Sequence, residues 1–214
     1  SPALTEKNLN LANWLANYYA SPLGLVLKTM LPKFVKKPKA PELAGFELHN
    51  PNFVLNEHQR IAITQIGGAL GSSANFLLHG VTGSGKTEVY MQIIRDLISQ
   101  SRGCIVMVPE ISLTPQTVDR FHSRFGDCLA VIHSRLPQAR RVEEWHRIRN
   151  GQARVVVGAR SAVFSPVQNL GIIVIDEEHD TSYKQGETPR YHAREVAAWR
   201  VQNSGAVLLL GGAT

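Results

Sequence analysis

The chain has 214 residues, of which 43% are hydrophobic, so it is long enough for one domain with a full core and part of a second. Its net charge of +6 favours a polyanionic partner, although a solvated basic surface explains the same excess. Two cysteines exclude a disulfide framework and a four-cysteine zinc site within the chain. The sequence shows no apolar run of membrane-spanning length and no signal-peptide pattern, which favours a cytoplasmic protein without membrane contact.

Residues 1–32 are predicted to form two helices. The second helix is expected to begin at Ser21 and Pro22 and to stop before Pro32. Apolar side chains recur at helical spacing in the first: Leu11, Trp14, Leu15, Tyr18 and Tyr19. Such a stripe belongs to a core more often than to a binding surface. Residues 33–52 are basic and contain prolines, which predicts a linker, with nucleic-acid contact as the weaker alternative.

A larger domain is expected over residues 53–214. Asn56 is a good N-cap for a helix that runs to about Leu70. Apolar strands then alternate with amphipathic helices, and the strands are expected at 76–78, 104–108, 129–132, 155–157, 172–175 and 206–210. This alternation predicts an α/β fold, in which a mostly parallel sheet of buried strands carries helices on both faces. Ligands of such sheets bind beyond the carboxyl ends of the strands.

The first chemical motif occupies residues 80–87, between a predicted strand and a predicted helix, and fits the phosphate-binding pattern G-x-x-x-x-G-K-[ST]. Its glycines allow backbone N–H groups to point at phosphate oxygens at the positive end of a helix. Lys86 is expected to reach the β- and γ-phosphates, and the Thr87 hydroxyl to ligate Mg²⁺. The predicted nucleotide-binding residues of this loop are Gly80, Val81, Thr82, Gly83, Ser84, Gly85, Lys86 and Thr87. The alternative is a glycine-rich turn that binds nothing.

The second motif, Asp176-Glu177-Glu178-His179, follows an apolar strand. Asp176 is expected to hold Mg²⁺, directly or through water, and Glu177 to polarise an attacking water. Together with Lys86, these two carboxylates are the predicted catalytic residues. The alternative is an exposed acidic turn, and His179 on its own is as consistent with a structural role as with a link between two ligands.

The second motif resembles the DEEH box of superfamily-two DNA helicases. Five stretches together resemble the primosomal protein N′ (PriA) family of replication-restart helicases: GVTGSGKTEVY (80–90), VPEISLTPQ (108–116), GARSAVFSP (158–166), DEEHDTSYKQ (176–185) and PRYHAR (189–194). The resemblance covers residues 53–214, and residues 1–32 resemble less specifically the segment that precedes the family's helicase core. It implies a RecA-like P-loop NTPase lobe, preceded by a short helical segment, with ATP and Mg²⁺ as cofactors.

The resemblance also implies roles for residues outside the two motifs. Gln59 matches the Q motif, in which a side-chain amide recognises adenine. Arg160 and Ser161 match motif Ib, where a guanidinium and a hydroxyl suit DNA phosphates. An aromatic-rich loop is expected to stack on single-stranded bases, unless it is an ordinary polar surface loop. The implied DNA-binding residues are Pro109, Glu110, Thr114, Gln116, Arg160, Ser161, Tyr183, Lys184, Arg190 and Tyr191.

The final Gly211-Gly212-Ala213-Thr214 resembles motif III, in which serine is usual at the position of Gly212. The resemblance implies that His179, Gly212 and Thr214 couple hydrolysis to strand separation. We recognise no winged-helix domain, DNA-end-binding domain, second lobe with its arginine finger, or cysteine-rich zinc insertion, and interpret the sequence as a fragment. The family's zinc site is expected in the missing downstream part.

The function predicted from the sequence is that of the ATP-binding lobe of a 3′→5′ DNA helicase in replication restart and primosome assembly at stalled forks. Single-stranded and forked DNA are the expected partners, and the family implies primosome and single-strand-binding proteins. One alternative is a double-stranded DNA translocase or branch-migration motor, which shares both motifs. The other is a nucleotide-gated DNA-binding module without turnover. This lobe alone is expected to bind ATP without a motor's turnover, because the second lobe supplies the arginine finger.

Overall fold

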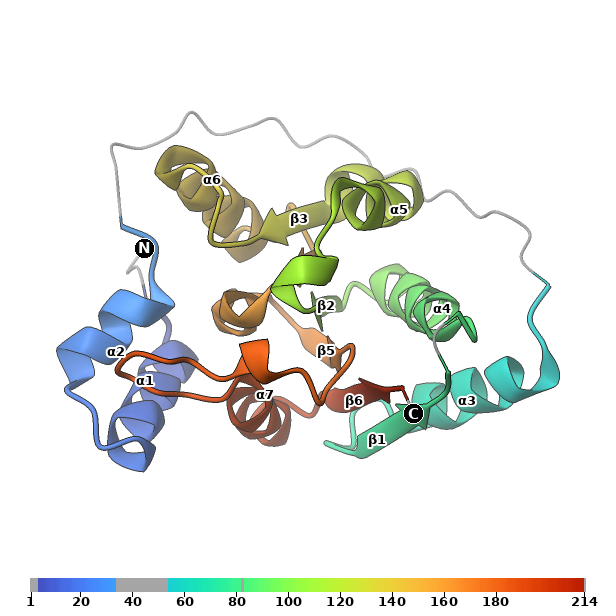
Figure 1. Ribbon diagram of the computed structural model, residues 1–214, viewed down its shortest axis with the longest axis horizontal. Helices are drawn as coiled ribbons and strands as arrows, with labels where there is room; N and C mark the ends of the chain where they lie inside the picture. The colour runs from blue at the N-terminus through green and yellow to red at the C-terminus, as the bar shows by residue number, and fades with distance from the viewer. Residues whose placement is uncertain (1–3, 34–53, 82, 214) are drawn as a thin grey trace.

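The computed structural model describes residues 4–33, 54–81 and 83–213, so the predicted linker lies outside the described residues apart from Lys33. Its centre is a six-stranded sheet with the order β1-β6-β5-β2-β4-β3 (Figure 1). All neighbouring strands run parallel. The strands are β1 (Asn75–His79), β2 (Gly103–Met107), β3 (Leu129–Ile132), β4 (Val155–Gly158), β5 (Leu170–Ile175) and β6 (Val207–Gly212).

Helices cover both faces of this sheet, which confirms the predicted α/β architecture (Figure 1). The helices are α1 (Glu6–Tyr18), α2 (Leu23–Met30), α3 (Glu57–Gly68), α4 (Lys86–Ser99), α5 (Pro115–Phe125), α6 (Gln138–Arg149) and α7 (Ala193–Gln202). One buried cluster joins α3, α4 and α5 to one face, and a second joins α1, α2, α6 and α7 to the other. Among the described residues, no helix is long and apolar enough to cross a membrane.

The central strands are buried on both faces, because helices pack against each side of them. Every residue of β2, β4 and β5 is buried. The predicted apolar runs are therefore core strands, as parallel sheets require. The first strand differs from the prediction of a buried run: β1 lies at the sheet edge, where Leu77 is 62% exposed.

Local capping explains where two helices begin. The Asn56 side chain accepts a hydrogen bond from Gln59 N at 2.9 Å, and Gln59 Oε1 accepts one from Asn56 N at 3.0 Å. This reciprocal capping box satisfies two N–H groups that the first turn of α3 leaves unpaired. At α5, the Thr114 hydroxyl accepts from Thr117 N at 3.3 Å, and Pro115 occupies the first helical position.

The two N-terminal helices pack into the core of the larger domain. Leu11, Leu15 and Val26 belong to the same buried cluster as Ile173 and Ile175 of β5. Trp14 stacks on Trp199 of α7, with ring centroids 5.6 Å apart. The predicted apolar stripe is thus confirmed as core at its centre, whereas Tyr18 at its end is 59% exposed.

Candidate nucleotide-binding site

Three motifs meet at the carboxyl ends of neighbouring strands, because β6 lies between β1 and β5. The phosphate loop follows β1, the Asp-Glu-Glu-His sequence follows β5, and Gly211 and Gly212 end β6. Gly80 N donates to Gly212 O at 3.1 Å, and Glu178 N donates to Gly211 O at 2.9 Å. The end of β6 therefore fixes the positions of both other motifs.

The phosphate loop turns directly into the N-terminus of α4. Gly83 and Gly85 have φ angles of 80° and 86°, a left-handed conformation that favours glycine. Lys86 is only 9% exposed, and its Nζ donates to Gly80 O at 2.6 Å. The same ammonium lies 3.9 Å from Glu177 Oε1. The loop thus brings a buried cation beside the acidic motif, while the predicted Thr82 lies outside the described residues.

Gln59 lies against the phosphate loop. Its Nε2 is 3.5 Å from the carbonyl oxygens of both Ser84 and Gly85, while its Oε1 caps α3. The residue predicted to recognise adenine thus bridges α3 and the loop. Recognition of a base by this amide requires it to give up at least one of these contacts.

Asp176 sits at the carboxyl end of β5 and is partly buried. Burial raises the pKa of its carboxyl group, and the hydrogen bond that it accepts from the Tyr90 hydroxyl at 3.0 Å opposes that rise. The sequence motifs give Tyr90 no role beyond its place at the end of the stretch 80–90. The signal that points to a role is that a buried tyrosine hydroxyl usually has a hydrogen-bond partner.

Glu177 adopts a φ of 46°, in the left-handed region that is unfavourable for a residue with a side chain. Such strain, of about 1–3 kcal/mol, concentrates at functional sites. The two oxygens of its carboxylate have different neighbours, since Lys86 Nζ is 3.9 Å from Oε1 and His179 Nε2 is 3.8 Å from Oε2. His179 itself is 59% exposed.

Glu178, which the sequence left without a role, connects the acidic motif to α7. Its Oε2 accepts from Arg194 Nη1 at 3.0 Å. This contact and the bond from Glu178 N to β6 hold the turn that carries Glu177 from two sides. Thr214, for which a coupling role is predicted, lies outside the described residues.

The oxygen donors of the site suit a nucleotide-bound Mg²⁺. The predicted ligands are the Asp176 carboxylate and the Thr87 hydroxyl, which are hard oxygen donors. Over residues 4–33, 54–81 and 83–213, no group of three or more His, Cys, Asp or Glu side chains is placed to hold a metal ion. Magnesium commonly takes one or two protein oxygens and completes its shell with phosphates and water. The donor set therefore fits Mg²⁺ that arrives with a nucleotide.

The predicted motif Ia residues follow the carboxyl end of β2, on the same side of the sheet as the phosphate loop. Pro109 is buried, whereas Glu110, Thr114 and Gln116 are exposed. Glu110 accepts a hydrogen bond from the Ser134 hydroxyl, and Thr114 caps α5. Two of these side chains thus have structural partners, and Gln116 presents its amide to solvent.

The aromatic-rich loop does not form the predicted stacking platform, because Tyr183 and Tyr191 are 0% and 1% exposed. The Tyr183 hydroxyl lies 2.6 Å from Asp176 O and 3.1 Å from Met107 O. The Tyr191 ring packs on Phe164, with centroids 4.9 Å apart. Both rings therefore belong to the core and are unavailable to bases in this structure.

Arg160 is also committed within the protein. Its Nη1 donates to Ser182 O at 2.9 Å and to Lys184 O at 2.7 Å, which ties the aromatic-rich loop to the end of β4. The predicted phosphate contact by this guanidinium is therefore replaced here by main-chain contacts. Ser161, Lys184 and Arg190 remain exposed.

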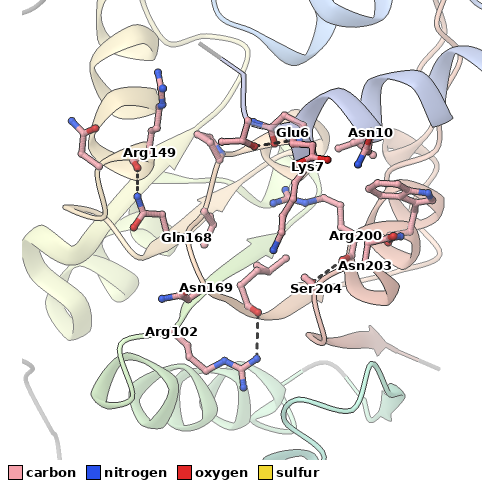
Figure 2. A pocket seen from close by; sticks show the side chains of 18 residues that line it. Glu6, Lys7, Asn10, Arg102, Arg149, Gln168, Asn169, Arg200, Asn203 and Ser204 are labelled. Atoms are coloured by element: carbon pink, nitrogen blue, oxygen red, sulfur yellow. Dashed lines mark hydrogen bonds between the residues drawn. The ribbon is translucent and has the colours of Figure 1, made fainter. Parts of the chain in front are cut away.

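A cavity of about 1370 Å³ lies elsewhere, between α1, α7 and the amino-terminal ends of the strands. Figure 2 shows Lys7 pointing from α1 into this cavity, which Arg102, Arg149 and Arg200 also line. Burial lowers the pKa of Arg200 to about 10. Because Arg102 precedes β2 and Ser204 precedes β6, the cavity lies at the amino-terminal ends of the strands. The phosphate loop lies at their carboxyl ends, so the cavity is not the nucleotide site.

The phosphate loop and the acidic motif follow two parallel strands, β1 and β5, that are separated by β6, an arrangement typical of helicase motor lobes. Residues 56–214 match the family described as DEAD/DEAH box helicase, and the chain belongs to this family. Residues 1–32 match the family described as 3'DNA-binding domain (3'BD). The second match differs from the expectation that no part of a DNA-end-binding domain is present.

Among individual proteins, the chain is similar to the replication restart protein PriA of several bacteria, which confirms the resemblance found in the sequence. It is 52% identical to the Bacillus subtilis protein over 162 residues, which is 75% of this chain and 20% of that protein. It is 38% identical to the Treponema pallidum protein over 211 residues, which is 98% of this chain and 32% of that protein. The chain therefore spans a third or less of these relatives.

Solved structures share the fold at low sequence identity. RecG bound to a three-way DNA junction matches with a TM-score of 0.54 and 20% identity, over 95% of this chain and 26% of that one. The UvsW helicase of bacteriophage T4 matches with a TM-score of 0.51 and 18% identity, over 79% of this chain and 57% of that one. These likenesses establish the fold alone.

Proposed function

We propose that the chain is the ATP-binding lobe of a 3′→5′ DNA helicase that acts in replication restart and primosome assembly at stalled forks. The observation that carries the proposal is the convergence of Lys86, Asp176 and Glu177 at the carboxyl end of β6, whose carbonyl groups bond both motifs. The similarity to PriA proteins supports the biological setting. We further propose residues 1–32 as a helical segment that precedes the lobe, residues 33–52 as a linker, and the cytoplasm as the place of action.

Phosphate binding rests on the loop and on Lys86. The backbone N–H groups at the N-terminus of α4 would bind the β- and γ-phosphates, and the Lys86 ammonium would leave Gly80 O, 2.6 Å away, for a phosphate oxygen. Thr87 and Asp176 would hold Mg²⁺, which offsets phosphate charge when bound. Glu177 would orient the attacking water and accept its proton. Gln59 would select adenine.

DNA contact rests on the exposed polar groups at the same edge of the sheet. Gln116, Ser161, Lys184 and Arg190 are exposed there, and the net charge of +6 favours a polyanion. We propose that these groups contact the phosphates of single-stranded and forked DNA. Arg160 would act through its hold on the loop that carries Lys184. His179, Gly212 and Thr214 would couple the nucleotide to this track, and primosome and single-strand-binding proteins would be partners of the whole helicase.

Nucleotide binding is tested by titrating a fluorescent ATP analogue against the chain and its Lys86→Ala variant. We expect no detectable binding by the variant, because among the described residues this ammonium contacts just the loop carbonyls and Glu177, and it is the cation placed to meet a phosphate there. Lys28→Ala is the matched control, since Lys28 is exposed on α2 and its loss should leave affinity unchanged. Undiminished affinity of the Lys86 variant would refute the assignment.

DNA binding and turnover separate the alternatives. Fluorescence anisotropy should show weak, salt-dependent DNA binding by this lobe, because a single lobe neutralises few phosphates. Tight or salt-independent binding would contradict this. A chain extended through a second lobe should release phosphate about 10³-fold faster or more, because that lobe supplies an arginine to the transition state. If duplex DNA stimulates that extended chain more than forks do, a double-stranded DNA translocase replaces the proposed helicase.

A further inference from the structure

Tyr90 joins the nucleotide-binding helix to the acidic motif. We propose that its hydroxyl is a positioning donor that fixes the Asp176 carboxylate for Mg²⁺, and that residue 211 is glycine because this hydroxyl fills the space of a side chain there. The inference rests on the proposed function, in which Asp176 holds the nucleotide-bound metal. It adds a positioning residue that neither the motifs nor their spacing identify.

The geometry begins on α4. Tyr90 lies four residues after Lys86, so both side chains project from the same face of the helix. Tyr90 is 1% exposed, and its Oη donates to Asp176 Oδ1 at 3.0 Å. A phenol is protonated at neutral pH, so this hydroxyl has a hydrogen to donate. A single rigid helix thus supplies the phosphate-binding cation and the donor that orients the carboxylate.

Gly211 provides independent support from β6. A Cβ atom at this position would lie 1.9 Å from Tyr90 Oη and 2.9 Å from Asp176 Oδ1, closer than non-bonded atoms approach. The strand cannot move away freely, because Gly211 O accepts from Glu178 N at 2.9 Å. Any side chain at residue 211 must therefore displace the Tyr90 hydroxyl from Asp176.

The neighbouring Gly212 shows that this restriction is specific. Among the described residues, a Cβ atom there would meet only Leu77 Cδ1, at an ordinary contact distance of 3.7 Å. Two successive glycines in the same motif thus differ in what they allow. Residue 211 is restricted by the Tyr90–Asp176 hydrogen bond, whereas residue 212 has room for a small side chain.

The test measures how much Mg²⁺ strengthens binding of a fluorescent ATP analogue, as the ratio of dissociation constants in EDTA and in Mg²⁺. In Tyr90→Phe we expect the affinity in EDTA to be retained and the ratio to fall about tenfold, the usual effect of losing one hydrogen bond to a charged group. Tyr19→Phe is the matched control, because it removes a hydroxyl that bonds His192 N at the same 3.0 Å but far from the site. Its ratio should equal that of the unaltered chain.

A second variant keeps the test independent of how well Tyr90→Phe folds. Gly211→Ala should lower the same ratio, and it should lower it less in a Tyr90→Phe background, because the obstructing oxygen is then gone. A Tyr90→Phe protein with an unchanged ratio, or Gly211→Ala effects that are equal in both backgrounds, would overturn the inference. If the unaltered chain binds the analogue with no Mg²⁺ dependence, the proposed metal role of Asp176 fails first, and the inference fails with it.

Discussion

Replacing Arg124 by methionine should destabilise the fold strongly, because it leaves a buried carboxylate without its charge partner. Arg124 of α5 and Glu88 of α4 are each 5% exposed, and Arg124 Nη2 pairs with Glu88 Oε1. The same oxygen accepts from Gln92 Nε2 at 2.7 Å. Glu88 Oε2 is buried with no hydrogen-bond partner among the described residues, so the carboxylate depends on this guanidinium.

The size of the effect follows from this burial. Removing one partner of a buried ion pair costs about 3–5 kcal/mol, because the remaining charge stays in a low dielectric. For a domain of this size each kcal/mol lowers the melting temperature by about 2–4 °C, so the midpoint should fall by roughly 6–20 °C. The double variant Glu88→Gln, Arg124→Met should recover much of the loss, since it buries no unpaired charge and keeps an acceptor for Gln92.

Urea denaturation measures the loss of unfolding free energy in the single and the double variant, provided that the slope of the transition is unchanged, and thermal unfolding measures the fall in melting temperature. Arg140→Met is the matched control: Arg140 pairs with Glu143 at 2.8 Å on the surface, where its loss should leave the midpoint unchanged. A single Arg124 variant as stable as the unaltered chain would refute the reasoning. So would a double variant that is as unstable as the single one.

Three further predictions concern other parts of the fold. Cys104 and Cys128 are both fully buried, and burial raises the pKa of each thiol. Neither should therefore react with a disulfide reagent until the chain unfolds, and reaction of the folded chain at the rate of an exposed thiol would contradict this. Burial lowers the pKa of His192, whose Nδ1 caps α7 by accepting from Arg194 N at 3.2 Å. Folding stability should therefore decrease as pH falls below about 6.5, where the unfolded chain binds the proton first, and His192→Asn should reduce that decrease in urea titrations at several pH values. Gly212→Ser should change the free energy of unfolding by no more than about 0.5 kcal/mol, because a serine Cβ atom at this position lies at an ordinary 3.7 Å from Leu77 Cδ1. A larger loss in urea denaturation would contradict this.

The sequence by itself determined what depends on neighbouring residues. The strands β2, β4 and β5 follow from continuous apolar runs, since a strand covered on both faces must be apolar throughout. The starts of α3 and α5 follow from Asn56 and Thr114, whose side chains bond N–H groups three residues ahead. The phosphate loop and the acidic motif were also identifiable, because their chemistry needs fixed residue types at short spacing.

The tertiary structure alone decided which distant residues meet. Tyr183 and Tyr191 are of a residue type that stacks on bases, yet the loop folds back on the sheet and buries both rings. The strand order, with β6 between β1 and β5, set Gly211 against Tyr90 and Asp176. The Arg124–Glu88 pair likewise joins two helices that are separate in sequence. Such contacts arise from side-chain packing between elements, and spacing along one element carries no information about the residue that will face it from another.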